Sequence, residues 1–293
     1  MVQGDAPASH PADSDLERRS LLRIGLSAAV SITAAAHIPR AVRAGARRAT
    51  APESETNALA ERSAPQWLWV RDTHSPTPAP SPPPLSTISA VHPWARPAYY
   101  VRDVLPDAPA NAIALTVDDG PHPVYTPMVL EVLRRYGVKA TFSMIGINVQ
   151  RYPGVARQVV AEGHTISNHS MWHPIPFTAL NHAAIHAEVA DAMNRVWDAT
   201  RTVPRLFRAP GGSWSPTVFD ALARYDLVPV DWDVDPRDWT VPGVAHIEGV
   251  LDTGRGGDIL LCHDGGGNRL QTVQALNQVL PALLDRKLEF VTL

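Results

Sequence analysis

Polar side chains that could take part in catalysis follow several apolar, strand-like runs in the later part of the chain. They are Asp118 and Asp119, His169 and His173, Arg208, Asp235 and Asp238, and His263. Each has an ordinary explanation when taken alone, since a loop aspartate commonly caps a turn and a lone histidine commonly lies on the surface. In parallel α/β folds, however, the carboxyl ends of the strands meet at one rim, where ligands bind. Their shared position therefore predicts a single active site.

The spacing of two of these histidines indicates a metal site. His169 and His173 lie four residues apart, so one helical turn or a tight loop can direct both imidazoles at one divalent ion. An acidic residue such as Asp119 completes a set of two nitrogens and one oxygen, which leaves positions for water and substrate as in catalytic zinc sites. Asp118 is then available to accept a proton from water, and His263 is a candidate acid.

Apolar runs alternate with helical patterns from residue 112 onward. The predicted strands are Ala112–Val117, Ala140–Ile145, His164–Ser167, Leu206–Arg208, Leu227–Asp231, Ile259–Cys262 and Leu288–Leu293. Apolar residues at helical spacing occur within residues 126–136, 185–196 and 215–222. Strand and helix alternation predicts a parallel sheet covered by helices. About seven such units favour an α/β barrel over a doubly wound sheet.

The N-terminal third has the composition of an export signal followed by a stalk. Residues 1–44 contain the pair Arg18-Arg19 ahead of a weakly hydrophobic stretch, and they resemble a twin-arginine signal. An amphipathic helix is the alternative interpretation. Residues 45–110 lack a sustained period and include a proline-rich stretch, so we predict a largely disordered linker. The folded domain is then predicted to span residues 111–293.

Charge and cysteine content exclude several protein classes. The 293-residue chain has a formal net charge of −3, and residues 111–293 carry 15 basic and 19 acidic side chains. This balance argues against nucleic-acid binding as the main function. The single Cys262 cannot form an internal disulfide and is most simply a small buried hydrophobic residue. No apolar run approaches the roughly 20 residues of a membrane span, so we expect no permanent membrane helix. We also expect the protein to be a monomer.

Five short motifs, in this order, resemble those of the NodB-homology polysaccharide deacetylases, carbohydrate esterase family 4. They are TVDDG (116–120), HSMWH (169–173), RAPGG (208–212), DPRDW (235–239) and LCH (261–263). The resemblance covers about residues 112–293 and implies a distorted (β/α) barrel. It also implies that the protein removes acetyl groups from sugars with a divalent metal, zinc first and cobalt as the alternative.

The resemblance implies a role for each residue of the first three motifs that could do chemistry. Asp119, His169 and His173 would hold the metal, and Asp118 would be the general base. Arg208 resembles the arginine that positions this base. Metal ligands and the proton acceptor would therefore come from two strand ends, and the positioning arginine would come from a third.

The remaining implied roles concern the acid and the acetyl pocket. His263 would protonate the departing amine, and Asp238 would orient and tune its imidazole. Trp239 and Leu261 would form the apolar wall of the pocket. The backbone N–H of Gly211 would bind the oxyanion that forms on the acetyl group.

The chain departs from the family pattern at two positions. Val117 stands where the family usually has phenylalanine, and Gly211 stands where an aromatic residue is frequent. The second change removes a side-chain wall from the substrate groove. Trp214 and Trp172 could supply stacking surfaces for sugar rings instead, and a packing role is an equal alternative for each.

These features together predict an exported deacetylase of N-acetylglucosamine glycans, secreted or located in the periplasm or cell wall. Peptidoglycan is the favoured substrate, and chitooligosaccharide is next. An acetyl xylan esterase is the alternative within the family, and a catalytically silent carbohydrate-binding relative is a second alternative. Every catalytic position is filled, which argues against a silent protein. A two-carboxylate glycosidase would leave the two-histidine site unexplained.

Overall fold

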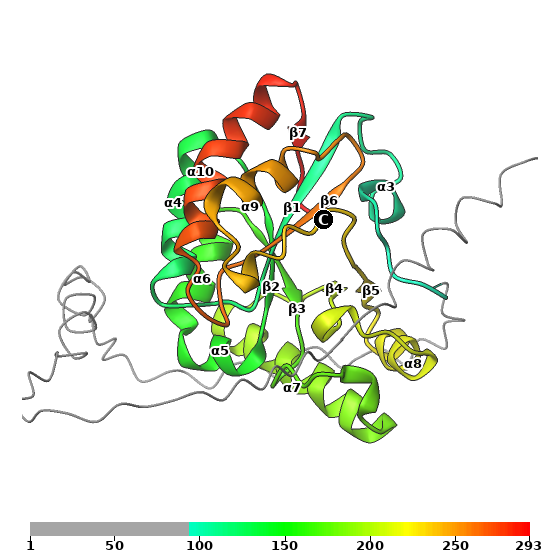
Figure 1. The fold of residues 1–293 in the computed structure, drawn as a ribbon. Helices are drawn as coiled ribbons and strands as arrows, with labels where there is room; N and C mark the ends of the chain where they lie inside the picture. Colours follow the sequence, from blue (N-terminus) through cyan, green and yellow to red (C-terminus); the bar gives the residue numbers. More distant parts are fainter. Residues whose placement is uncertain (1–93) are drawn as a thin grey trace, which may run out of the picture. The chain divides into compact units, whose positions relative to one another are not determined.

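The computed structural model describes residues 94–293, which form a curled parallel sheet with helices packed around it (Figure 1). The strands are β1 (Ala112–Asp118), β2 (Thr141–Met144), β3 (Thr165–Asn168), β4 (Leu206–Phe207), β5 (Val228–Pro229), β6 (Ile259–His263) and β7 (Glu289–Phe290). The spatial order is β5-β4-β3-β2-β1-β6, with β7 paired to β1. All these strand pairs are parallel. The predicted distorted (β/α) barrel is confirmed.

Strand β1 lies between β2 and β6 and fixes the centre of the rim. All seven of its residues are buried, as expected for a parallel strand with a mostly apolar sequence. The register pairs Asp118 with Ser143 on β2 and with His263 on β6. The end of β1 therefore carries two carboxylates into the middle of the site.

The helices fill the connections between the strands. They are α3 (Val101–Val104), α4 (Tyr125–Tyr136), α5 (Gly146–Arg151), α6 (Pro153–Ala161), α7 (His182–Thr200), α8 (Pro216–Arg224), α9 (Val244–Leu251) and α10 (Leu270–Asp285), with 3-10 turns η3 (Phe177–Ala179), η4 (Pro210–Gly212) and η5 (Asp238–Thr240). Helix α4 ends at Gly137, which has a left-handed φ of 66° that a glycine adopts without strain. Helix α7 buries Ile185 and Val189 on one face, as its apolar spacing predicts.

Residues 94–110 are part of the folded domain, which therefore begins earlier than the predicted boundary at residue 110. The N–H of Ala98 donates to Pro229 O in β5, and the N–H of Val101 donates to Gly257 O just before β6, each at 2.8 Å. Because β5 and β6 are the two ends of the strand order, this segment bridges them. Ala98 and Val101 are fully buried. The predicted export signal and the rest of the predicted linker lie outside the described residues.

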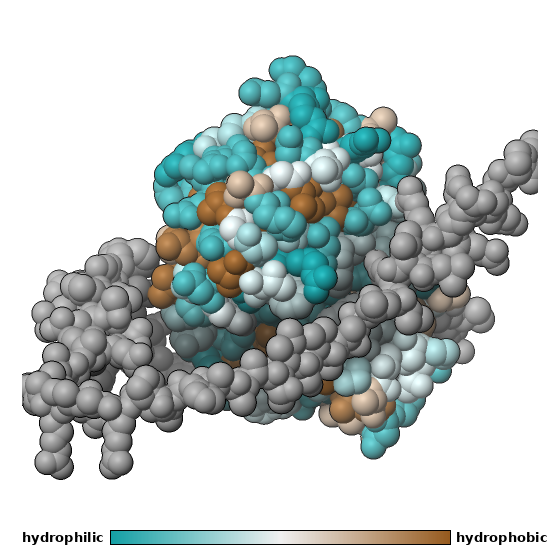
Figure 2. Space-filling model, viewed as in Figure 1, coloured by the Kyte–Doolittle hydropathy of each residue, from teal (hydrophilic) through white to brown (hydrophobic). Residues whose placement is uncertain are grey.

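Hydrophilic residues cover most of the described surface seen in Figure 2, and hydrophobic residues form smaller separate areas. Four large exposed hydrophobic side chains belong to the loops that follow β3 and β5, namely Trp172, Ile175, Trp239 and Val241. A ligand at the rim would find apolar contacts on these loops. Within residues 94–293, no helix has both the length and the apolar character that a membrane crossing requires.

Candidate active site

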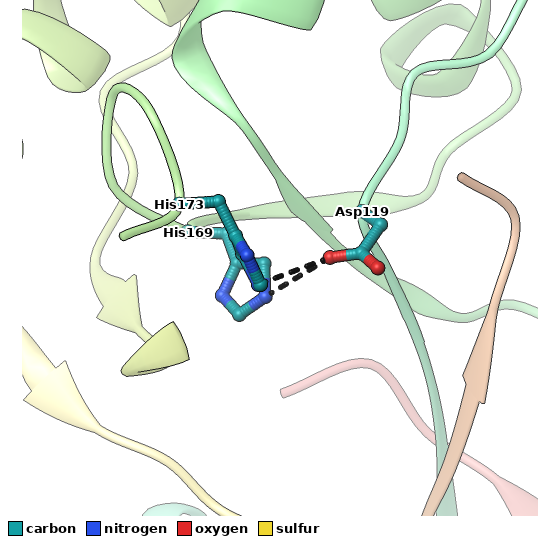
Figure 3. A group of neighbouring side chains, drawn as sticks. All are labelled: Asp119, His169 and His173. Carbon is teal, nitrogen blue, oxygen red and sulfur yellow. Dashed lines mark ion pairs between the residues drawn. The ribbon is translucent and has the colours of Figure 1, made fainter. Parts of the chain in front are cut away.

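Three side chains from two strand ends form a compact group at the rim (Figure 3). Asp119 follows β1, and His169 and His173 belong to the loop after β3. The Oδ1 atom of Asp119 lies 3.5 Å from His169 Nε2 and 3.2 Å from His173 Nε2. One potential ligand atom from each residue lies within 4.8 Å of the other two. The structure thus brings together the three predicted metal ligands.

The hydrogen bonds of this group suit a cation. Among the described residues, Asp119 Oδ1 is buried without a hydrogen-bond donor. His169 Nδ1 lies 2.8 Å from the carbonyl oxygen of Arg208. Because that oxygen can only accept, Nδ1 carries a proton, and Nε2 is the ring nitrogen that faces Asp119 and would bind a metal. Two imidazoles and a carboxylate in this orientation fit a divalent metal.

Two glycines allow the close approach of another loop to Asp119. A Cβ atom at Gly265 would overlap the carbonyl oxygen of Asp119, and one at Gly266 would lie 2.8 Å from its Oδ2. Asp119 itself has a left-handed φ of 73°. The loop after β6 therefore packs directly against Asp119, which the glycine run of this loop permits.

Asp118 is a buried carboxylate held by a buried arginine. Arg208 Nη1 donates to Asp118 Oδ1 at 2.9 Å and to Thr116 Oγ1 at 2.7 Å, and Nη2 donates to Asp231 O at 2.7 Å. Arg208 is 1% exposed and Asp118 is 2% exposed. The guanidinium is therefore fixed on several sides, and it fixes Asp118 in turn. The predicted positioning contact between Arg208 and Asp118 is present.

His263 is paired with Asp238 through both its side chain and its backbone. His263 Nδ1 lies 2.6 Å from Asp238 Oδ1, and the backbone N–H of His263 donates to Oδ2 at 2.9 Å. Burial alone would lower the pKa of His263, but the hydrogen bond and charge of Asp238, with other nearby carboxylates, raise it to about 9. The imidazole is therefore protonated at neutral pH and can act as an acid.

The predicted acetyl-pocket residues lie beside this pair along the chain. Trp239 follows Asp238 and is 48% exposed, with the guanidinium carbon of Arg237 5.2 Å from the centre of its ring. Leu261 is buried in β6, two residues before His263. Gly211 has a left-handed φ of 63°, a conformation that favours glycine over the aromatic residue frequent in the family.

The two tryptophans considered for sugar stacking have different environments. Trp214 stacks on Phe219 with ring centres 5.6 Å apart, and its Nε1 donates to Asp231 at 3.0 Å. Trp172 is 60% exposed in the loop between His169 and His173. These contacts favour the packing alternative for Trp214 and leave Trp172 accessible to a ligand.

Two aspartates near the rim have roles that the sequence did not indicate. Asp235 Oδ1 accepts from the N–H of Arg237 at 2.7 Å, so Asp235 stabilises the turn that leads into η5. Asp264, directly after His263, is fully buried and accepts a hydrogen bond from Thr126 Oγ1 at 2.5 Å. Burial and neighbouring carboxylates raise the pKa of Asp264 to about 7. The position of Asp264 directly after an apolar strand is the feature of the sequence that could have indicated a buried carboxyl group.

Comparison with known proteins agrees with this geometry. Residues 106–230 match the family described as "Polysaccharide deacetylase". The peptidoglycan-N-acetylglucosamine deacetylase of Bacillus cereus is 44% identical over 183 residues, which cover 61% of this chain and 85% of that protein. The chitooligosaccharide deacetylase of Bradyrhizobium sp. is 42% identical over 192 residues, with coverages of 61% and 87%. A family 4 carbohydrate esterase structure from Streptomyces lividans, in complex with acetate, superposes with a TM-score of 0.58 at 29% identity, covering 62% and 91%.

Proposed function

Because this chain belongs to the NodB-homology polysaccharide deacetylases of carbohydrate esterase family 4, we propose that it hydrolyses N-acetyl groups of N-acetylglucosamine glycans. One observation carries the proposal: a group of three side chains that could hold a metal, a buried carboxylate held by an arginine, and a histidine paired with a buried aspartate meet at the same rim. The names of the two relatives support peptidoglycan and chitooligosaccharide as substrates. Peptidoglycan is the substrate that we favour.

The metal would be held by Asp119, His169 and His173. Zinc is the first choice and cobalt the alternative, because imidazole and carboxylate ligands in an open set are typical of catalytic zinc sites. When bound, the ion would polarise the acetyl carbonyl and make water a stronger nucleophile. The proton transfers are then the task of this chain's own side chains.

Asp118 accepts the proton of the attacking water in this mechanism. Its Oδ1 is occupied by Arg208, whereas its Oδ2 lies 3.8 Å from His169 Nε2 and so faces the metal group. Arg208 therefore fixes the carboxylate with one oxygen directed at the place where water would attack. The water oxygen forms a bond to the acetyl carbon, and the carbonyl oxygen takes up the negative charge.

His263 donates the second proton. As the tetrahedral intermediate collapses, the C–N bond breaks, and the proton of the imidazolium goes to the departing amine. Asp238 stabilises the charged imidazole before this step. The backbone N–H of Gly211 would stabilise the oxyanion, and Trp239 with Leu261 would contact the acetyl methyl group. The products are acetate and a free amino sugar.

A substrate screen tests the proposal against its alternatives. Purified protein with zinc should release acetate from peptidoglycan and chitooligosaccharides without producing new reducing ends, because the C–N bond and not the glycosidic bond is cleaved. Acetate and reducing ends would be measured in the same samples, with heat-treated protein as the control. Acetate from acetyl xylan alone would identify an O-deacetylase, no acetate would identify a silent relative, and new reducing ends would identify a glycosidase.

Export by the twin-arginine route would deliver this activity to the wall, and the sequence around Arg18 and Arg19 supports it. The double change Arg18→Lys and Arg19→Lys should retain active enzyme inside the cell, because the pair would act only as a transport label. Acetate release would be measured in fractions from inside and outside the cell. Unchanged export of the double variant would contradict this assignment.

A further inference from the structure

The start of α10 forms hydrogen bonds to the chain segment that contains Asp238, the partner of His263, and Trp239, the predicted pocket residue. Thr272 Oγ1 donates to Asp238 Oδ2 at 2.7 Å. One residue earlier, the side chain of Gln271 accepts from the N–H of Gly243 at 2.8 Å. Both bonds join α10 to the stretch 238–243, which contains η5. One helical turn that contributes no residue to the five motifs thus helps to hold this stretch in place.

Of these contacts, the bond from Thr272 reaches the catalytic pair itself. Asp238 Oδ1 is engaged by the imidazole of His263, and Oδ2 accepts from the backbone of His263 and from Thr272. Thr272 and Asp238 are each 1% exposed. Because water has little access to this bond, loss of the hydroxyl would leave a buried carboxylate short of one donor.

We propose that Thr272 is a positioning residue of the deacetylase, which holds the Asp238 carboxylate in the orientation that directs His263 at the leaving amine. This role rests on the proposed function, since it requires that His263 acts as the acid. The hydroxyl donates to the oxygen that the imidazole does not use, and so opposes rotation of the carboxylate about its Cβ–Cγ bond. The imidazole is thereby held in one orientation.

The hydroxyl can be removed and restored with little change of shape. Thr272→Val replaces the hydroxyl with a methyl group, and Thr272→Ser retains the hydroxyl. We expect the valine variant to lower kcat on an N-acetyl chitooligosaccharide roughly tenfold, the scale of a lost hydrogen bond to a charged group, with a smaller change in KM. Hydrolysis of an aryl acetate should fall less than threefold, because a phenolate leaves without an acid. The serine variant should recover most of the amide activity.

A matched control separates this role from general loosening of the segment. Gln271→Met removes the other side-chain bond from α10 to the same segment and leaves Asp238 untouched. It should not change the ratio of amide to ester activity. Equal losses on both substrates in the valine variant, no loss at all, or the same change of ratio in the methionine variant would each overturn the proposal.

A double-mutant cycle tests whether Thr272 acts through Asp238. In the background of Asp238→Asn, addition of Thr272→Val should lower amide activity further by less than twofold, because the carboxylate to be positioned is gone. A full tenfold further loss would overturn the proposal. His263→Ala provides the check on its premise: equal loss on amide and ester would show that His263 is not the acid. Lack of any acetate release by wild-type protein would instead refute the proposed function.

Discussion

Removal of the divalent metal should abolish acetate release, and addition of zinc or cobalt should restore it. Asp119, His169 and His173 place three ligand atoms within 4.8 Å of one another, and the ion that they would hold polarises the acetyl carbonyl. His173→Ala should lose both bound metal and activity, because two remaining ligands hold an ion weakly. Metal content by atomic spectroscopy and acetate release would be measured on the same preparations.

The control for this experiment is a histidine of the same chain away from the site. His246 is exposed on α9, so His246→Ala should keep its metal content and its activity. Full activity of a preparation shown to be free of metal would contradict the assignment of the group. Metal retention by the His173 variant would show that another residue completes the set of ligands.

Replacement of the general base should leave the metal in place and slow the reaction. Asp118→Asn keeps the size of the side chain and an oxygen for Arg208, but the amide cannot accept the proton of water. We expect kcat to fall by about 10² to 10⁴, the range typical of general acid–base catalysis, with a smaller change in KM. Single-substrate kinetics and metal analysis of the variant would provide both numbers.

The same variant should also be less stable, because Arg208 and Asp118 form a buried ion pair. Loss of one partner leaves an uncompensated buried charge, which typically costs about 3–5 kcal/mol. Activity should therefore be measured at a temperature where unfolding experiments show the variant folded. If Asp118→Asn lacked metal while Asp119→Asn retained it, the two aspartates would have the opposite roles.

The sequence predicted the elements that have a regular apolar pattern and the polar residues that follow the strands. Strand β1 was evident because its sequence is mostly apolar, and His169 and His173 were evident because their spacing suits a metal. The Ala98 contact with β5 was not predictable, because a single bridge has no period and lies beyond a proline-rich stretch. Thr272 was missed for a related reason: a threonine within an apolar helix gives no sign of the carboxylate that it meets.

The role of Trp214 could not be predicted from the sequence either. A tryptophan near a predicted sugar site suits both stacking and packing, and only three-dimensional neighbours distinguish these roles. Phe219 lies one helical turn after Pro216 in α8, and this places its ring parallel to that of Trp214 with an angle of 6° between them. The contact with Phe219 therefore favours packing, and it depends on the direction of one helix.

The register of β1 against β6 has a consequence for how the two proton transfers are coordinated. Asp118 and His263 are direct partners on neighbouring parallel strands, which lie about 4.8 Å apart in such sheets. The proposed proton acceptor and donor are thus anchored one strand spacing apart, a span suited to flanking a single acetyl carbon. Their separation is set by main-chain hydrogen bonds in the core of the domain and not by a mobile lid. The sheet therefore fixes the relative positions of Asp118 and His263 before substrate binds, and these positions should persist for as long as the sheet stays folded.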